Sequence, residues 1–456
     1  MDSSSNAYSV SPSLWNQLQQ MLQDDPFRGI TFLIFMGAIL HTFLAGKFAA
    51  KSKQITTVCG HETYTSRLLH WLGEVEAIFG IWLIPLVVCF VGFKGWSDTV
   101  TYFSTRHYQE PIFVFAIMTI AATKPILCLA EICIRKIVRC LGKECPSTWW
   151  VCILMFAPLL GSLITEPAAM TIAAMLLANK VFVHNPGKSF SYATIGLLFV
   201  NVSVGGVLTN FAAPPILMVA TKWNWSSAYV FSHFGIKAMI GIVLASLFYF
   251  VLFSKQLKQL NTNAKTSDVV SENKDNVPLW VIAIHTLFLI WVVFNSHHTV
   301  FVVWGFLAFL CIAHILKEYQ SHIAIKESLL VGCFLAGLVT HGGLQEWWIE
   351  AVLSRLGDLT LFLGSVILTA FNDNASLTYL ASLVPEFMDN FRLQSAVVSG
   401  AIVGGGLTVI ANAPNPAGQA LLSKYFPNGI VKPLPLLLGA LFPTILFMFI
   451  FRCVNC

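Results

Sequence analysis

The sequence has few charged residues. Asp, Glu, Lys and Arg make up 11% of its 456 residues, whereas a soluble protein has about 25%. Hydrophobic residues make up 56%, and the mean hydropathy is +0.72. Apolar runs recur from residue 28 to the end, which is typical of membrane-spanning helices, and the alternation of a membrane β-barrel is absent. We therefore expect an all-α polytopic membrane protein.

The sequence also shows neither a signal-peptide pattern nor a zinc-binding cysteine pattern. The first 28 residues are polar and have no basic region of the kind that opens a signal peptide, so we expect residues 1–28 to form an external N-terminal segment. The 11 cysteines are scattered, and none forms a pair with a second Cys or His pair at zinc spacing. The net charge of +5 is small, and basic loops on one membrane face explain it better than nucleic-acid binding does. We expect no cofactor.

Two apolar stretches differ in length from the others. Residues 148–183 and 358–388 are each too long for one crossing, and the first is too short for two full crossings with a turn. We predict that each forms a re-entrant hairpin, which is tolerated at membrane depth where protein or water surrounds it. The remaining apolar stretches predict ten crossings, at 29–50, 70–93, 111–134, 190–221, 228–254, 279–295, 299–316, 327–343, 393–422 and 430–452.

The polar stretch 261–276 lacks hydrophobic periodicity and predicts a linker between two halves. We place a cytoplasmic linker at 255–277, a first repeat at 29–254 and a second at 278–456. Each half then has five crossings, an odd number, so the second repeat enters the membrane inverted. In this layout 18 Lys and Arg lie on one side and 7 on the side of the termini. The positive-inside rule then makes both termini external.

The two predicted hairpins share a sequence pattern. The first contains TEPAAMTIAAMLL and the second NDNASLTYLASLV, and their ungapped alignment places Glu166 opposite Asp373. A charge at the centre of a bilayer costs roughly 2.5–3.5 kcal/mol, so two acids at matching tips suggest a function. Glu74 and Glu76, by contrast, lie near the start of a predicted helix, where we expect them at the membrane interface.

The crossing after each hairpin also repeats. VGGVLT (Val204–Thr209) and VGGGLT (Val403–Thr408) agree at five of six positions, and each is followed by Asn and two prolines. Proline inside a helix removes a backbone hydrogen bond and clashes with the preceding turn. We therefore predict broken helices at 190–221 and 393–422. Inverted repeats with broken helices are typical of secondary transporters, whose binding sites lie near the midplane.

These patterns predict a cation or proton site. Glu166 and Asp373 would bind sodium or a proton, and Asp373 could also cap a helix, since N-D-N-A opens a half-helix. Hard cations such as sodium prefer oxygen ligands. The predicted contributors of neutral oxygens are Thr165, Thr171, Asn372, Asn374 and Thr378 at the hairpins, and the unwound segments around Asn210, Pro214, Asn412, Pro414 and Asn415.

Parts of the sequence resemble a known superfamily. Gly332–Asp358 followed by FNDNASLTYLASLVP (Phe371–Pro385) is similar to the second half of the ion transporter superfamily, and TNFAAPPI (Thr209–Ile216) is similar to its first broken helix. The superfamily includes D-type sodium/proton antiporters, arsenite pumps and divalent anion/sodium symporters. The Asp-Asn pair of the antiporters corresponds to Asp373 and Asn374. The chain is most similar to a sodium/proton antiporter family known mainly by sequence, and the resemblance implies a homodimer with a moving hairpin domain.

Three other functions remain as alternatives. The resemblance allows sodium-coupled symport of a dicarboxylate-like anion or arsenite efflux. Neither tip has the symporters' Ser-Asn-Thr motif, and neither has Arg or Lys to attract an anion. A membrane aspartyl protease would need G-x-G-D, and Arg355–Asp358 reads RLGD. We therefore expect a sodium/proton antiporter of the cell (inner) membrane that is not an enzyme.

Overall fold

The computed structural model describes residues 14–142, 144–266, 277–320 and 323–453. Within these ranges every regular element is a helix and none is a strand. Eight of the described helices are long and apolar enough to cross a membrane, and a ninth is added if the bent pair α5 and α6 is one span. The protein is therefore an all-α polytopic membrane protein, as the composition predicts.

The N-terminal helices differ from the predicted crossings at one break. The expected crossing at 70–93 is divided at Gly73, where a β-carbon would lie 2.7 Å from the backbone nitrogen of Ala49. The elements in this region are α1 (Leu14–Asp24), α2 (Pro26–Cys59), α3 (Tyr64–Leu72), the 3₁₀ turn η1 (Val75–Ala77) and α4 (Ile78–Ser104). This break places a short turn, with Glu76 in it, between α3 and α4.

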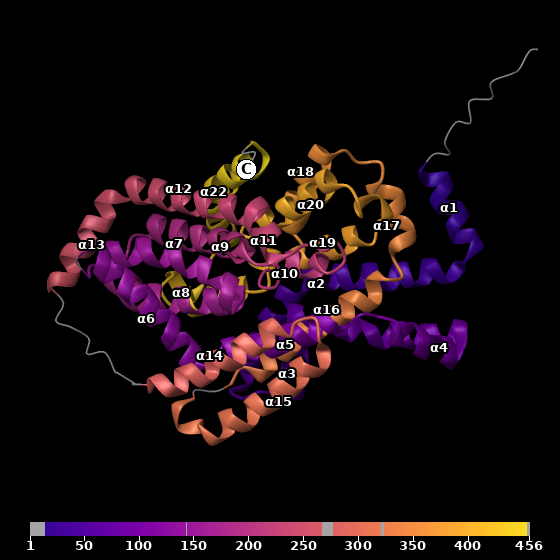
Figure 1. Cartoon of the computed structure of the whole chain (residues 1–456), viewed down its shortest axis with the longest axis horizontal. Coiled ribbons are helices and arrows are strands. Elements are labelled where there is room, and N and C mark those ends of the chain that lie inside the picture. The colour runs from indigo at the N-terminus through magenta and orange to yellow at the C-terminus, as the bar shows by residue number, and fades with distance from the viewer. Residues whose placement is uncertain (1–13, 143, 267–276, 321–322, 454–456) are drawn as a thin grey trace, which may run out of the picture.

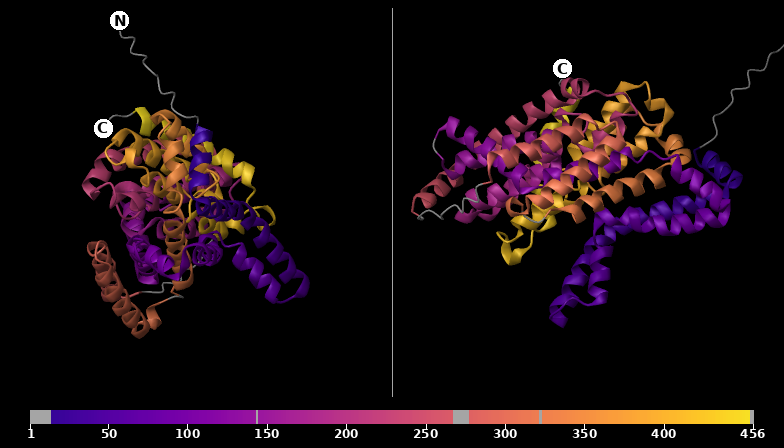
Figure 2. Two further views of the ribbon diagram at one scale, coloured as in Figure 1. Left: turned by 90° about the vertical axis from the view of Figure 1, so that its right-hand side faces the viewer. Right: turned by 60° about the horizontal axis from the view of Figure 1, so that its bottom comes forward.

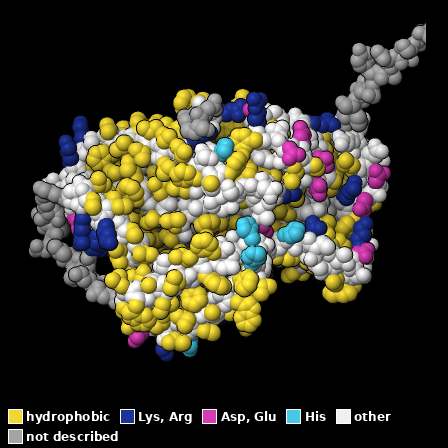
Figure 3. All heavy atoms as spheres, viewed as in Figure 1, with side chains coloured by type: hydrophobic (Ala, Val, Ile, Leu, Met, Phe, Trp, Pro, Cys, Tyr) yellow, Lys and Arg dark blue, Asp and Glu magenta, His cyan; other side chains and the backbone are white. Residues whose placement is uncertain are grey.

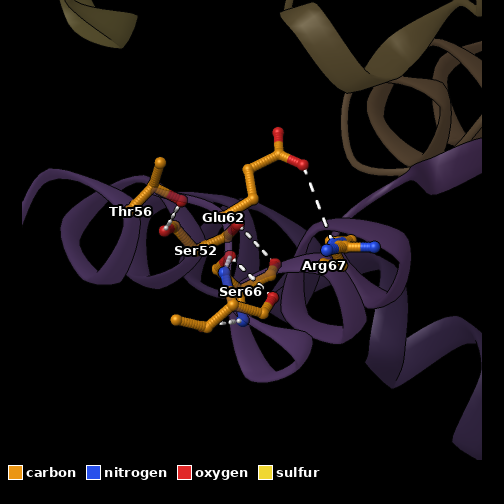
Figure 4. A network of polar contacts seen from close by, with 6 residues as sticks. Ser52, Thr56, Glu62, Ser66 and Arg67 are labelled. Atoms are coloured by element: carbon orange, nitrogen blue, oxygen red, sulfur yellow. Dashed lines mark hydrogen bonds and ion pairs between the residues drawn. The ribbon is translucent and has the colours of Figure 1, made fainter. Parts of the chain in front are cut away.

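Helix α3 folds back along α2, and the pair projects from the body of the molecule (Figure 2). A capping box starts α3, in which Thr63 and Ser66 exchange side-chain to backbone hydrogen bonds. Ser52 of α2 donates to the carbonyl of Ser66 at 2.6 Å, and Figure 4 shows this contact beside the Arg67–Glu62 ion pair. Local polar contacts therefore hold this arm together.

The predicted crossing at 111–134 is bent. It consists of α5 (Gln109–Ala121) and α6 (Lys124–Leu141), whose axes differ by 68°. Pro125 lies in the first turn of α6. Proline disfavours helical backbone at the residue before it, so the break falls just upstream of Pro125. This third interruption was not predicted.

In the first half a helix pair precedes an interrupted helix. The pair is α7 (Pro146–Ile164) and α8 (Glu166–Lys180), and the interrupted helix is α9 (Lys188–Gly205), η3 (Gly206–Leu208) and α10 (Pro214–Ala220). By length and composition α7 and the segment starting with α8 could each cross a membrane. The half ends with α11 (Ser227–Val230), the π-helical turn η4 (Phe231–Gly235), α12 (Ile236–Leu252) and α13 (Ser254–Thr266).

The second half repeats this order with shorter arms. It has α14 (Leu279–Phe294), α15 (Thr299–Ile315), α16 (Ile325–Gly342), α17 (Glu346–Leu353), the pair α18 (Asp358–Thr369) and α19 (Asn374–Ser382), the interrupted helix α20 (Phe391–Gly404), η7 (Val409–Ala411) and α21 (Asn415–Ser423), and finally α22 (Pro433–Cys453). The arms α18 and α19 have 12 and 9 residues, fewer than the 20 or so that a crossing needs. The start of the predicted linker is helical in α13, and its residues 267–276 lie outside the described part.

The two halves interlock at the centre of the molecule. Helix α8 packs on α21, and α19 packs on α10, so the second arm of each pair contacts the interrupted helix of the other half. Figure 1 shows α7, α8 and α9 gathered on one side and α18 and α20 on the other, with α10 and α19 close together below α20. The broad hydrophobic face in Figure 3, with Lys and Arg near its edges, is suited to lipid.

Candidate functional site

Glu166 is the first residue of α8 and is fully buried. Its Oε2 accepts a hydrogen bond from Nδ2 of Asn412 at 2.7 Å, a contact between the two halves of the chain. Its Oε1 has no hydrogen-bond partner. The preceding Thr165 has φ of 78°, a conformation that costs a β-branched residue of order 1–3 kcal/mol. The turn is thus strained where it presents the carboxylate.

Asp373 is the N-cap of α19 and is 7% exposed. Its Oδ1 accepts the N–H of Ala375 at 2.9 Å, and the N–H groups of Ser376 and Ala413 also interact with the carboxylate. Helix N-termini favour negative charge, so this backbone stabilises the ionised form, whereas burial favours the neutral form. The helix cap that we considered for Asp373 is therefore present, and it does not prevent a second role.

A glycine at the equivalent position of each VGG motif lies close to a hairpin tip. A β-carbon on Gly206 would lie 2.6 Å from Glu166 Oε1, and one on Gly405 would lie 2.9 Å from Nδ2 of Asn374. Gly206 and Gly405 occupy equivalent positions in VGGVLT and VGGGLT. Only glycine allows the interrupted helix to approach the tip this closely.

The glycine before each of these packs on the first arm of the helix pair. A β-carbon on Gly205 would meet the backbone of Pro158 in α7, and one on Gly404 would meet the carbonyl of Val366 in α18. The threonine that ends each motif completes the contact: Thr209 donates to the carbonyl of Ser162 at 2.8 Å, and Thr408 donates to that of Ala370 at 2.7 Å. The shared sequence therefore corresponds to a shared set of contacts.

A small cavity lies at the second tip. Its free volume is about 20 Å³, enough for one water-sized molecule. Asn412 is 1% exposed, and its Oδ1 has no partner. The lining residues are Glu76, Val331, Phe334, Asp373, Val409, Ile410, Asn412, Ala413 and Pro416. Two acidic residues and one amide residue therefore border a cavity whose exposed surface is apolar.

Glu166 does not line this cavity, but it is connected to it. Asn412 donates to Glu166 and faces the cavity that Asp373 lines. The charges of Glu166 and Asp373 also interact through space. In the described part of the chain, no three His, Cys, Asp or Glu side chains come close enough to hold a metal ion together. Any cation at this site would therefore meet at most two carboxylates.

The other predicted residues lie in three different settings. Asn374 is buried with both side-chain polar atoms unpartnered, and the hydroxyl of Thr165 is likewise unpartnered. Asn415 donates to the carbonyls of Gly405 and Thr408 and so holds the interruption open. Thr171 and Thr378 donate to carbonyls of their own helices.

Asn210 lies at a second small cavity, lined also by Gln109, Glu110 and His297. Its side chain is held by Trp225 and Ser227, so it does not join the oxygens around Asp373. Pro214 and Pro414 lie at the starts of α10 and α21, and Asn372 lies in the turn before Asp373.

The position of Glu76 differs from the one that the sequence predicts. Glu76 was expected at the membrane interface, yet it lines the cavity with Asp373. The signal that could have found it is the sequence Gly73-Glu74-Val75-Glu76, since a glycine inside an apparent helix with two acids beyond it can mark a break.

The comparison with known families covers nearly the whole chain. A family model described as "Putative Na+/H+ antiporter" matches residues 26–454. The matched range includes both helix pairs, both interrupted helices, Glu76 and the cavity. No curated protein matches the chain in sequence.

Proposed function

The chain belongs to the putative Na+/H+ antiporter family, and from this premise we propose that it exchanges sodium ions for protons by alternating access. Sodium and protons compete for buried carboxylates near the membrane midplane, and Asp373 is the group that exchanges them. Membership of the family supports a cation/proton antiporter in general, and the site around Asp373 supports this particular mechanism.

The observation that carries the proposal is the position of Asp373. It is the carboxylate that combines burial, stabilising backbone N–H groups and access to a cavity of about 20 Å³. An isolated buried carboxylate is unfavourable unless its charge is compensated. Either a proton or a sodium ion in the cavity provides that compensation. Because one carboxylate cannot be fully neutralised by both at once, release of one favours binding of the other.

The surrounding oxygens suit a small hard cation. Asn412, whose buried Oδ1 has no hydrogen-bond partner, borders the same cavity, and sodium prefers carboxylate, amide and carbonyl oxygens. No Lys or Arg among the described residues lines the cavity. The N-termini of α8 and α19, which could attract a substrate anion, already have Glu166 and Asp373 on them. These features favour a cation over an anion.

The orientation in the membrane forms part of the proposal. We place the protein in the cell (inner) membrane with both termini external, as the distribution of Lys and Arg predicts. Two inverted repeats would then bring the tips to the midplane from opposite sides. The homodimer implied by the superfamily resemblance would hold one part of each protomer still while the helix pairs move.

The test is a flux measurement in proteoliposomes. An inward sodium gradient should drive protons outward in wild-type vesicles, followed with a pH-sensitive dye, and Asp373→Asn should reduce this flux to that of empty vesicles. Sodium-dependent proton flux that is unchanged in Asp373→Asn would refute the assignment. Currents on a solid-supported membrane that respond to a dicarboxylate or arsenite, and not to sodium or lithium, would identify symport or arsenite efflux instead.

A further inference from the structure

Glu76 is the one other acidic side chain among the residues that line the Asp373 cavity. It lies in the 3₁₀ turn η1 between α3 and α4, far in sequence from both predicted tips. The charges of Glu76 and Asp373 interact through space. The cavity therefore lies between two carboxylates that belong to different parts of the chain.

The neighbouring acid, Glu74, is engaged elsewhere. Its Oε1 accepts a hydrogen bond from Lys326 at 2.9 Å and lies 3.5 Å from His70. Lys326 and His70 therefore lie at Oε1 of Glu74, while its Oε2 is buried without a partner. Among the described residues Glu76 forms no ion pair, and of these two acids it is the one that borders the cavity.

The polar wall between Glu76 and Asp373 also points to a ligand. The Asn412 side chain is 1% exposed, its Oδ1 has no hydrogen-bond partner, and the residue borders the cavity. A buried amide oxygen without a donor is unfavourable by about 1–3 kcal/mol. A cation in the cavity would accept this oxygen as a ligand together with the two carboxylates.

We propose that Glu76 is the second acidic residue of the sodium-binding cavity, opposite Asp373, and that Glu166, which does not line the cavity, positions the amide of Asn412. The proposal rests on the proposed sodium/proton exchange. It separates the three acids: Asp373 and Glu76 contact the transported cation, and Glu166 positions the amide that also contacts it. The trio does not form one chelating group, in agreement with the absence of such a group among the described residues.

Helix α16 connects the cavity to the Glu74–Lys326 pair. Val331 and Phe334 of α16 line the cavity, and Lys326, which pairs with Glu74, lies five residues before Val331. At 1.5 Å per residue this separation is about 7–8 Å along the helix. The Glu74–Lys326 pair therefore lies about one turn and a half from the cavity.

The experiment measures the sodium concentration that gives half-maximal proton flux in proteoliposomes, and ²²Na⁺ binding to the purified protein. Glu76→Gln should raise the half-maximal sodium concentration about tenfold or more and weaken ²²Na⁺ binding by a similar factor. The matched control is Glu327→Gln, which removes an exposed acid next to Lys326 and should leave both values unchanged.

Each result of these measurements either supports the role of Glu76 or contradicts it. Wild-type sodium affinity in Glu76→Gln, or an equal loss in Glu327→Gln, would overturn the role of Glu76. If Glu76→Gln is not recovered as a folded protein by size-exclusion chromatography, Glu76→Asp replaces it: the shorter carboxylate should weaken sodium binding, and unchanged binding would overturn the proposal. Wild-type protein with neither sodium binding nor sodium-driven proton flux would instead refute the proposed function itself.

Discussion

The two hairpin tips have similar sequences but hold their acids differently. Glu166 is the first residue of its helix and reaches across the molecule to Asn412, whereas Asp373 caps its own helix through the N–H of Ala375. Glu166 is sealed from the cavity, and Asp373 lines it. The difference of one methylene group between Glu and Asp accounts for part of this, because the longer side chain can leave its helix end and the shorter one stays on it.

This comparison teaches that matching positions in a repeat need not have matching roles. Both carboxylates lie at helix N-termini, and a glycine of the following motif lies close to each tip, Gly206 at Glu166 and Gly405 at Asn374. What each acid contacts depends on the other half. Asp373 should therefore exchange the ion, and Glu166 should position a neutral ligand.

The largest expected effect is the difference between variants of the two hairpin-tip acids, Asp373 and Glu166. Asp373→Asn should abolish sodium-driven proton flux, because it removes the exchanging carboxylate. Glu166→Gln should retain flux with roughly tenfold weaker sodium affinity, because the amide oxygen of Gln still accepts from Asn412 and only the charge assistance of this hydrogen bond, about 1 kcal/mol, is lost. Flux and half-maximal sodium concentration in proteoliposomes distinguish the two. Abolished flux in Glu166→Gln with residual flux in Asp373→Asn would reverse the assigned roles.

A smaller effect is expected at the paired glycines. Gly206→Ala should weaken sodium affinity about as much as Glu166→Gln, because the new β-carbon displaces the Glu166 carboxylate. Combined with Glu166→Gln it should add little, since both changes act on the same contact. Gly46→Ala, at a glycine with no neighbour within 4 Å of an added β-carbon, is the control and should behave as wild type.

The sodium titration of the Gly206→Ala, Glu166→Gln double variant checks this coupling. Full additivity of the two losses would show that Gly206 acts on something other than Glu166. Gly405→Ala should leave the Glu166 effect unchanged, because the nearest neighbours of its new β-carbon are Ser203 and Asn374 rather than Glu166.

The smallest effect concerns stability. Thr209→Val and Thr408→Val each remove a part-buried hydrogen bond from the interrupted helix to the first arm, and each should lower the free energy of unfolding by about 1 kcal/mol. Thermal unfolding in detergent should show similar decreases in Tm for the two variants. Thr57→Val, at an exposed helical threonine, is the control. A large decrease for one variant and none for the other would show that the two contacts are not equivalent.

The sequence could predict the tips because each acid stands inside an apolar run. It could predict the interruptions because glycines and prolines follow a shared motif. These are local signals, and they require no knowledge of what lies across the molecule. The all-α membrane fold and the family follow from the same local patterns and are confirmed.

The position of Glu76 could not be predicted in the same way. The stretch 70–93 has the hydropathy of one continuous crossing, and the break at Gly73 depends on the close approach of Ala49. The bond from Asn412 to Glu166 likewise joins residues 246 positions apart. Hydrophobic periodicity reports on neighbours within a turn or two, so it carries no signal for either of these long-range contacts.

The Glu166–Asn412 bond also has a consequence for biosynthesis. The ribosome must add 246 residues after Glu166 before Asn412 exists, which takes roughly 10–50 s at 5–20 residues per second. During that interval the N-terminal half is already at the translocon with an acid whose native partner has not been made. A newly made N-terminal half therefore needs either a proton on Glu166 or a position in which Glu166 is exposed to water. A truncated chain that stops before Asn412 should be a substrate for membrane quality control.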